Sequence, residues 1–199
     1  MHVVDLYYDA RMNASIDLEK ERSEKGFWRV SLILIILILG LRLFVFGPFL
    51  VYGSSMEPTF ETGDYLIVDE LTYKFKDPAR GDVIVLRPPL ADKQNTHFIK
   101  RVVGLPNETI IVKGSTVIIK NAAHPEGFQL SEDYIKFQSD REVTLTLDGN
   151  EYFVMGDNRE VSSDSRIWGP ITKEAITGRA FIRLYPFGGI GILPGKETQ

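Results

Sequence analysis

Cysteine is absent from this chain, and its absence removes several kinds of chemistry together. The 199 residues contain no cysteine and only three histidines. Disulfide bonds, thiolate catalysis and cysteine-based zinc sites are therefore excluded. The sequence also lacks an H-E-x-x-H segment and an EF-hand loop, so it gives no support for a metal enzyme. We expect no metal and no other cofactor.

The chain also lacks an excess of positive charge. Its formal net charge is −4, and no stripe of basic residues interleaved with aromatic residues is present. Such a stripe is the usual electrostatic footprint of a protein that binds nucleic acid. We therefore expect no nucleic-acid partner.

Long hydrophobic runs are scarce, and the single one lies near the N-terminus. It extends from Phe27 to Val51 and is interrupted only by Arg29, Ser31, Gly40, Arg42, Gly47 and Pro48. About 20 apolar residues are enough to cross the hydrocarbon core of a bilayer. We predict a transmembrane helix at residues 27–47, preceded by a tail at 1–26 and followed by one domain at 48–199.

Three other interpretations compete for this run. Residues 32–39 have no polar face, which an amphipathic helix on a membrane surface requires. A cleaved signal peptide has a shorter apolar core and a small-x-small exit, whereas the exit here, residues 47–52, is bulky. A buried helix of a soluble protein is the third alternative.

The basic residues set the expected orientation of the predicted span. Five of them lie between residues 11 and 29, and beyond Arg42 the next basic residue is Lys74. Lysine and arginine beside a span are enriched on the cytoplasmic side. We expect a single-pass protein of the cell membrane, with the tail in the cytoplasm and the large domain outside it.

Beyond the run, short β-branched and aromatic segments alternate with turn signals rich in glycine, proline, asparagine and aspartate. The predicted strands are residues 65–68, 83–86, 97–103, 109–112, 116–119, 143–147, 152–155 and 180–185. We also predict a short helix at 171–177, an exposed loop at 87–95 and an inserted lobe at 122–141. The expected fold class is mainly β, an antiparallel sheet folded into a sandwich or a partly closed barrel.

The segment from Gly53 to Thr59 places a hydroxyl, that of Ser55, just beyond the apolar run. No G-x-S-x-G elbow surrounds this serine. His2, His97 and His124 are interpreted as surface histidines. Spacing alone does not exclude a Ser-His-Asp triad.

A serine without a histidine needs another base, and Lys100 is the best-placed lysine. An apolar pocket lowers the pKa of a lysine because it disfavours the charged form. Strand alternation puts Phe98, Lys100 and Val102 on one face and Arg101 on the other, where it is free to stay charged. A lysine on a solvated face is the alternative, and the local sequence does not decide between the two.

A third polar cluster lies in residues 155–169, between two strand-like runs. Asp164 and Arg166 are spaced to pair and to hold this loop in one shape. Ser162 is a candidate to hydrogen-bond a neutral lysine amine and orient it. An ordinary turn-rich surface loop is the alternative interpretation.

Together these clusters resemble the bacterial type I signal peptidases, which are membrane-anchored endopeptidases with a serine–lysine pair. The resemblance covers the apolar run and essentially the whole outer domain. The segments that carry it are Gly53–Thr59, Gly81–Val85, Lys100–Pro106, Gly156–Gly169 and Gly178–Phe187. A glycine at position 53, one span and few insertions look like the Gram-positive-type branch.

The resemblance implies a role for each candidate residue. Ser55 is the nucleophile, Lys100 the general base, and Ser162 the serine that positions the lysine, while the supporting ion pair consists of Asp164 and Arg166. The implied reaction is acyl transfer through an acyl-enzyme, with the lysine accepting and returning a proton. The backbone N–H of Ser55 is expected to help stabilise the oxyanion.

The resemblance also implies the substrates, which are exported preproteins cleaved after a small-x-small motif. Such an enzyme works at the lipid bilayer, close to the export translocon. The specificity needs two shallow apolar pockets that admit alanine and exclude larger groups. Met56, Phe60 and Phe98 are the candidate pocket walls, with core packing as the alternative for Phe60. An extended substrate could add a strand beside the strand of Lys100.

The chain departs from the family pattern at three places. Gly53 stands where some members have a serine whose hydroxyl helps to form the oxyanion hole, so the second donor is left open. Glu160 and Val161 stand where Asp-Asn is usual, and Asn107-Glu108 replaces a common Gly-Asp. The last two departures concern residues that shape turns.

Two other functions compete with this interpretation. Self-cleaving repressors and stress proteins of the same serine–lysine clan carry a DNA-binding or short soluble N-terminus, which the apolar run argues against. An inactive, membrane-tethered β domain that binds exported proteins is the second. The presence of both Ser55 and Lys100 in full motifs disfavours it.

Overall fold

The computed structural model describes residues 26–40, 46–93 and 96–196. The chain divides into two units, Met1–Phe44 and Val45–Gln199, and each is described by itself. In the first unit residues 26–40 form a helix, and its large apolar side chains are exposed. Within these described ranges, no helix combines the length and the hydropathy needed to cross a membrane.

The predicted end of the transmembrane helix at residue 47 is wrong. Phe46 and Gly47 belong to strand β1 (Phe46–Leu50), which pairs antiparallel with β2 (Tyr65–Asp69). A residue that precedes proline is biased toward extended conformations, and Gly47 precedes Pro48. Residues 1–25 of the predicted tail and residues 41–45 of the predicted span lie outside the described residues.

The second unit consists of short strands with a few helical turns. Its first elements after β2 are α2 (Thr72–Phe75), β3 (Val83–Leu86), η1 (Ala91–Lys93), β4 (Phe98–Gly104), β5 (Thr109–Lys113), β6 (Thr116–Lys120) and β7 (Phe128–Gln129). They are followed by β8 (Glu142–Thr146), β9 (Glu151–Met155), α3 (Ser165–Trp168), β10 (Ile171–Thr172), η2 (Lys173–Ala175), β11 (Ile176–Tyr185), η3 (Phe187–Gly189) and β12 (Gly191–Ile192). Each predicted strand overlaps one of these.

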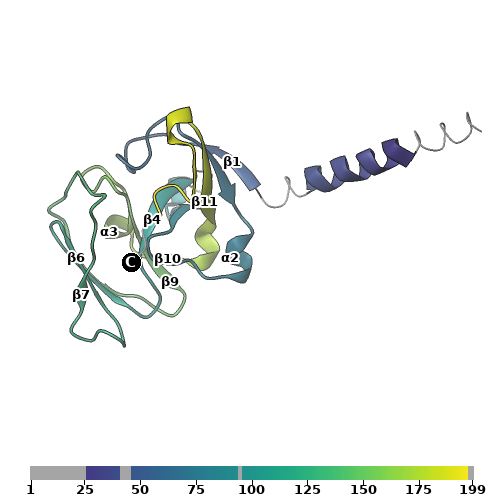
Figure 1. Cartoon of the computed structure of the whole chain (residues 1–199). Coiled ribbons are helices and arrows are strands. Elements are labelled where there is room, and N and C mark those ends of the chain that lie inside the picture. Colours follow the sequence, from purple (N-terminus) through teal and green to yellow (C-terminus); the bar gives the residue numbers. More distant parts are fainter. Residues whose placement is uncertain (1–25, 41–45, 94–95, 197–199) are drawn as a thin grey trace, which may run out of the picture. The chain divides into compact units, whose positions relative to one another are not determined.

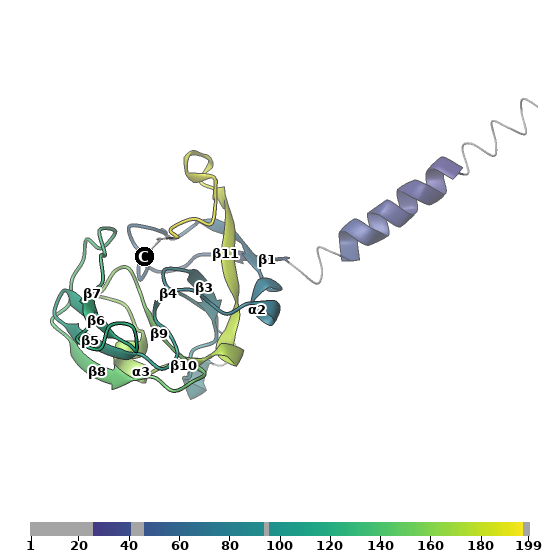
Figure 2. The same cartoon turned by 60° about the horizontal axis from the view of Figure 1, so that its bottom comes forward.

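The strands form two antiparallel sheets. The larger has the order β1-β2-β11-β3-β4-β9-β10, with β12 paired to β11, and the smaller has the order β7-β6-β5-β8. Figures 1 and 2 show β6 and β7 on the side of the domain away from β1 and β11, and Figure 2 shows β5 beside them. The large sheet is curled. Residues of β1 and β4 line the same cavity, although three strands lie between these two strands in the sheet. The prediction of a mainly antiparallel β fold is confirmed.

Two of the connecting segments contribute strands to the sheets. The predicted helix at residues 171–177 is wrong, since this stretch forms β10, the single turn η2 and the start of β11. The β-branched Ile171, Thr172, Ile176 and Thr177 favour extended structure. The segment predicted as an inserted lobe, 122–141, contributes β7 to the edge of the small sheet.

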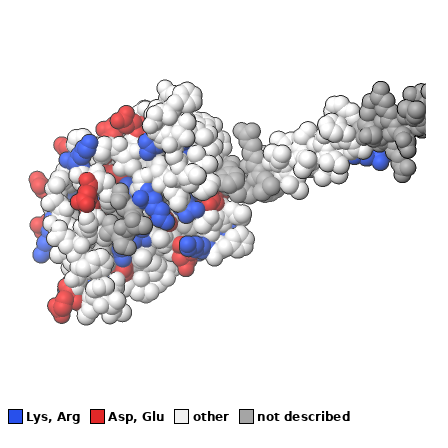
Figure 3. Space-filling view, viewed as in Figure 1, with Lys and Arg blue, Asp and Glu red and all other residues white. Residues whose placement is uncertain are grey.

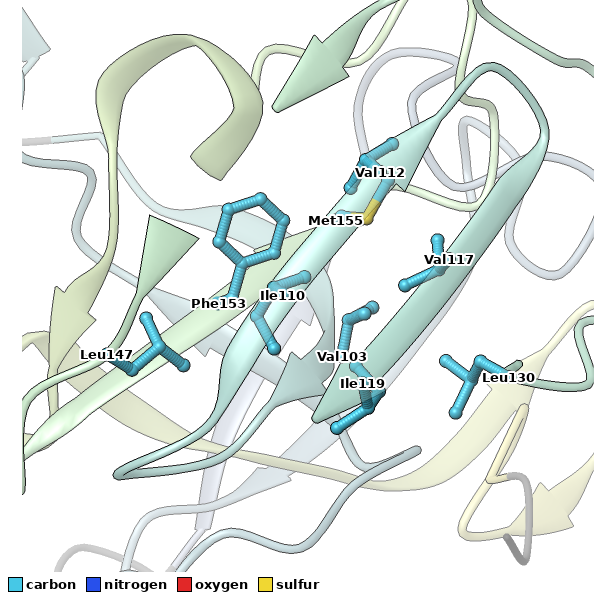
Figure 4. Close-up of a cluster of buried hydrophobic side chains, with 9 residues drawn as sticks. All are labelled: Val103, Ile110, Val112, Val117, Ile119, Leu130, Leu147, Phe153 and Met155. Carbon is cyan, nitrogen blue, oxygen red and sulfur yellow. The ribbon is translucent and has the colours of Figure 1, made fainter. Parts of the chain in front are cut away.

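Three apolar clusters hold the domain together. The first joins the small sheet to β4 and β9 and is drawn in Figure 4; it consists of Val103, Ile110, Val112, Val117, Ile119, Leu130, Leu147, Phe153 and Met155. The second lies under β3, β4 and β9. The third includes Val51, Met56 and Phe60 and so reaches the segment that carries Ser55. Burial of these side chains is the main favourable term that fixes this segment on the sheet.

Candidate active site

Ser55 lies in an irregular segment that leaves the end of β1 and returns to β2. The ends of this segment are tied together, because Val51 N–H donates to Asp64 O at 2.9 Å and Gly63 N–H donates to Val51 O at 3.0 Å. In the middle, Gly53 N–H donates to Thr62 Oγ1 at 2.9 Å. These bonds close the loop around Ser55 and limit its movement.

A tight turn follows Ser55 directly. Glu57 N–H donates to Ser54 O at 3.2 Å, and Phe60 N–H donates to Met56 O at 2.9 Å. We call residues 54–60 the Ser55 turn. Met56 and Phe60 anchor it, because their exposed fractions are 1% and 0% and both pack in the third apolar cluster. Both therefore pack in the core, as the alternative for Phe60 expected, and neither is among the residues that line the cavity described below. Their role as pocket walls stays a prediction.

Lys100 reaches Ser55 from the middle of β4. Its Nζ lies 2.8 Å from Ser55 Oγ and also donates to Ile99 O at 2.8 Å. Lys100 is only 3% exposed, so the lysine is not on a solvated face. The side chains of two residues that are 45 positions apart are thus in hydrogen-bond contact.

Burial lowers the pKa of Lys100 to about 8, from an ordinary value of 10.5. The carboxylates of Asp164 and Asp157 oppose this shift, and the guanidinium of Arg166 adds to it. A lysine with such a pKa is partly neutral near neutral pH, and a neutral amine can accept the proton of a neighbouring hydroxyl. The pair has the geometry and the electrostatics of a nucleophile and its base.

Asp164 and Arg166 form the predicted ion pair. Arg166 Nε donates to Asp164 Oδ1 and Nη2 to Oδ2, both at 2.8 Å, and Arg166 Nη2 also donates to Arg159 O at 2.9 Å. Burial would raise the pKa of Asp164. Its hydrogen bonds and its attraction to Arg166, with the N–H of Gly156 and the hydroxyl of Ser162, outweigh burial and lower the pKa. The carboxylate also caps α3, so the pair holds the loop in shape.

The same loop presses against the backbone of Ser55 at Gly156. A Cβ at position 156 would lie 2.4 Å from Ser55 O and 2.2 Å from Ser162 Oγ. Asn158 N–H donates to Ser55 O at 3.1 Å. Only glycine fits between these groups, because real Cβ atoms do not approach other atoms so closely. This close approach holds the loop and the Ser55 turn in a fixed position relative to each other.

The structure does not form the predicted hydrogen bond between Ser162 and Lys100. Ser162 Oγ is buried and faces Asp164, whose pKa it helps to lower, and the described residues include no hydrogen bond between Ser162 and Lys100. The side chain of Ser162 packs closely against Gly156. Ser162 therefore lies in the same loop contact as Ser55, and its predicted role toward the lysine stays a prediction.

Arg101 is a residue whose importance the sequence analysis missed. Strand alternation correctly predicts that Arg101 lies on the face opposite Lys100. That face is not open to solvent, because Arg101 is only 1% exposed. Its Nε and Nη2 donate to Asp157 Oδ1 and Oδ2 at 2.8 and 2.6 Å. Asp157 also accepts from Thr59 Oγ1 at 2.6 Å. The sequence signal that could have indicated its importance is the presence of a second charged residue directly after Lys100 in a strand-like run.

A cavity of about 420 Å³ opens beside the Ser55–Lys100 pair. Two chain segments, 49–55 and 96–100, form most of its wall, and Leu66, Val85, Val161 and Ser163 complete it. Phe98 lines it as predicted. His97 also lines it, and its side chain is exposed, as expected of a surface histidine. Ile99 was missed because alternation placed it on the face opposite Lys100.

Both segments that form the wall present an unpaired strand edge. Among the described strands, β1 pairs with β2 and with no other. In β4, residues 98–100 pair with β3, whereas the register with β9 begins at Arg101. One edge of residues 98–100 is therefore open, and an extended peptide can add to such an edge through main-chain hydrogen bonds.

Comparison with known proteins accounts for this combination of groups. Residues 25–185 match the sequence profile of the family described as signal peptidase, peptidase S26. The chain belongs to this signal peptidase family. The family assignment argues against both the self-cleaving repressors and the inactive binding domain that compete at the level of sequence.

Several signal peptidases are similar to this chain over most of their length. Signal peptidase I of Leptolyngbya laminosa is 40% identical over 165 residues, which are 80% of this chain and 78% of that protein. Probable signal peptidase I-2 of Synechocystis sp. is 35% identical, with 88% of this chain and 81% of that protein covered. Signal peptidase I of Bacillus licheniformis is 35% identical, with 86% and 94% covered. A Gram-positive-type branch stays a prediction, since these relatives include cyanobacterial proteins.

A crystal structure of a signal peptidase I from Enterococcus faecalis V583 also aligns with this chain. Its TM-score is 0.42 at 30% sequence identity, and the alignment covers 52% of this chain and 97% of that one.

Proposed function

We propose that this protein is a signal peptidase I, a serine endopeptidase that removes N-terminal signal peptides from exported preproteins. Cleavage follows a small-x-small motif, Ser55 is the nucleophile and Lys100 is the general base. The observation that carries the proposal is the 2.8 Å contact between Ser55 Oγ and the amine of a buried lysine. A cavity and an open strand edge lie beside that contact.

The reaction follows from the chemistry of the pair. Neutral Lys100 accepts the proton of Ser55 as Oγ attacks the scissile carbonyl carbon, and a tetrahedral intermediate forms. The protonated lysine then gives its proton to the departing amine, leaving the signal peptide bound to Ser55 as an ester. Lys100 next activates a water molecule, which hydrolyses the ester and restores the serine.

The oxyanion of the tetrahedral intermediate needs hydrogen-bond donors. The N–H of Ser55 is a donor that no hydrogen bond among the described residues uses, which supports its assignment. The N–H of Gly53 is already donated to Thr62 Oγ1, so it is an unfavourable choice for the second donor. Gly53 has no side chain to offer instead.

The small-x-small specificity is supported by the residues that line the cavity. Its wall is apolar along Leu66, Val85, Phe98 and Ile99, and Lys100 and Ser55 lie on the same wall. A peptide extended along the open edge of residues 98–100 points alternate side chains to the same side. Residues one and three before the scissile bond therefore face the wall together, and the residue between them faces away.

The membrane assignment belongs to the proposal as well. Residues 26–40 form a helix with exposed apolar side chains. In the catalytic unit, residues 184–195 carry no charged side chain, and Phe187, Ile190 and Ile192 are exposed. Figure 3 shows no charged atoms at the tip of this hairpin, at the top of the view. We propose that residues 27–45 anchor the chain with its N-terminus in the cytoplasm and the catalytic unit outside, near the translocon. Flotation of the protein with phospholipid vesicles tests the anchor.

The function is tested by incubating the full chain in detergent with a preprotein that carries an alanine-x-alanine site. N-terminal sequencing of the product should place the cut directly after the second alanine. Ser55→Ala and Lys100→Ala should each abolish the cut and keep the circular dichroism spectrum. Ser115→Ala and Lys113→Ala are matched controls, because both residues are exposed and lie at the turn between β5 and β6. Normal processing by either site variant would refute the assignment.

A further inference from the structure

The C-terminal residues follow a defined path across the back of the Ser55 turn. After β11, residues 191–192 pair with Ile182 and Arg183 as β12, and Leu193 N–H donates to Phe181 O at 2.7 Å. Lys196 Nζ then lies 3.3 Å from Asp82 Oδ1. We call residues 191–196 the strap. They lie beyond residue 185, where the match to the family profile ends.

The strap touches the Ser55 turn at Gly195. A Cβ built at this position would lie 2.4 Å from Thr59 Cγ2 and 3.2 Å from Phe60 Cε2. Gly195 also has a φ of +70°, which side-chain-bearing residues rarely adopt. Its carbonyl oxygen accepts a hydrogen bond from Arg101 Nη1. One glycine thus contacts both the turn after the serine and the residue after the lysine.

The contacts of Gly195 continue to the turn that follows Ser55 and to the strand that carries Lys100. Thr59 Oγ1 donates to Asp157 Oδ2 at 2.6 Å, and Asp157 is bound on its other side by Arg101. Arg183, on the strand that carries the strap, donates to Thr59 O at 2.6 Å and lies 4.5 Å from the centre of the Phe60 ring. The turn of Ser55 and the strand of Lys100 are therefore joined through the strap.

We propose that the strap holds the Ser55 turn against Lys100 and that Gly195 is its positioning residue. The inference rests on the proposed peptidase function, since it concerns the geometry of the same pair. None of residues 191–196 lines the cavity, so the strap does not contact substrate there. Its loss should slow the chemical step and leave binding unchanged, because a small displacement of reacting groups lowers the rate strongly.

The test compares Gly195→Ala with Gly191→Ala in the full chain. Gly191 is the matched control, because nothing lies within 4 Å of a Cβ built there. We expect Gly195→Ala to lower kcat for an alanine-x-alanine preprotein by roughly tenfold or more, with KM unchanged. Adding Thr59→Ser, which removes the methyl group in contact but keeps the hydroxyl, should restore part of kcat. Pro194→Gly, which adds no atoms, should cause a smaller loss of the same kind.

Amide hydrogen exchange gives a readout that does not depend on activity. The Phe60 amide bonds to Met56 O within the turn, and its exchange should be faster in Gly195→Ala and normal in Gly191→Ala. Three results would overturn the proposal that the strap holds the Ser55 turn. They are equal effects of the two alanine variants, an effect confined to KM, and unchanged exchange of the Phe60 amide. If the wild type leaves the preprotein intact, the proposed function fails, and the exchange measurement still decides whether the strap holds the turn.

Discussion

Arg101 and Asp157 form an ion pair whose nitrogen and oxygen, Nη2 and Oδ2, lie 2.6 Å apart, with almost no exposed area on either side chain. Arg101 follows Lys100 directly in the chain, and the charge of Asp157 acts to raise the pKa of Lys100. Arg101 also lies 4.0 Å from the ring centre of Tyr134. The ion pair thus links β4, the loop between β9 and α3, and the segment between β7 and β8.

Breaking this pair should destabilise the fold strongly. We expect Asp157→Ala to lower the free energy of unfolding by roughly 3–5 kcal/mol, because it leaves the guanidinium of Arg101 buried without its main partner. Urea denaturation in detergent measures the change. The control is Asp77→Ala, which removes an exposed partner of Lys173 and should change the free energy by about 0.5 kcal/mol or less. Similar losses in the two variants would contradict the argument.

The rate of processing should depend on the protonation of Lys100. Burial lowers the pKa of this lysine to about 8, and the charged form cannot accept a proton. We therefore expect kcat/KM to fall about tenfold for each pH unit below about 8. His97→Asn should keep this profile, although His97 lines the cavity. A rate that does not change between mildly acidic and mildly alkaline pH would count against a lysine base.

Lys100 should also lower the stability of the folded chain. Its pKa is about 8 in the fold and 10.5 ordinarily, so the unfolded chain binds the proton more tightly. The penalty is complete below pH 8 and disappears as the pH rises toward 10.5. Lys100→Met should therefore raise the free energy of unfolding at pH 7 by on the order of 3 kcal/mol while abolishing activity.

The same variant at alkaline pH provides the check. The advantage of Lys100→Met over the wild type should shrink steadily between pH 8 and 10.5, in denaturation curves measured at each pH. Lys113→Met, at an exposed position, should show no such advantage at any pH. A constant difference across this range would mean that the lysine is not held in a neutral form by the fold.

Gly156 should be intolerant of any side chain. An added Cβ meets Ser55 O at 2.4 Å, and a backbone oxygen cannot move aside as a flexible side chain can. We expect Gly156→Ala to destabilise the chain by about 1–3 kcal/mol and to reduce kcat by roughly a hundredfold. Gly149→Ala is the control, since its nearest atom would be Asn107 Oδ1 at 3.7 Å. Wild-type kcat in Gly156→Ala would show that the loop contact is unimportant.

Local patterns were sufficient for the strands and for part of the site. β-branched runs between turn signals predict segments that overlap β2 to β6, β8, β9 and β11, because strand preference is largely a property of neighbouring residues. They failed at β1, which lies within the apolar run that predicts a transmembrane helix. Apolar composition predicts removal from water, but it does not distinguish a bilayer from a sheet. The helix predicted at 171–177 failed for a related reason, since the stretch is too short for periodicity to decide.

By itself the sequence determined the chemical groups that are available, the antiparallel β class, and the motif order that marks a signal peptidase. Only the tertiary structure decided that Lys100 is buried and in contact with Ser55, that Met56 and Phe60 belong to the core, and that Arg101 and Gly195 support the pair. The physical reason is that burial, and with it the pKa of a lysine, depends on which distant segments cover a side chain. Alternation along one strand tells which way a residue points, and nothing about what it meets there.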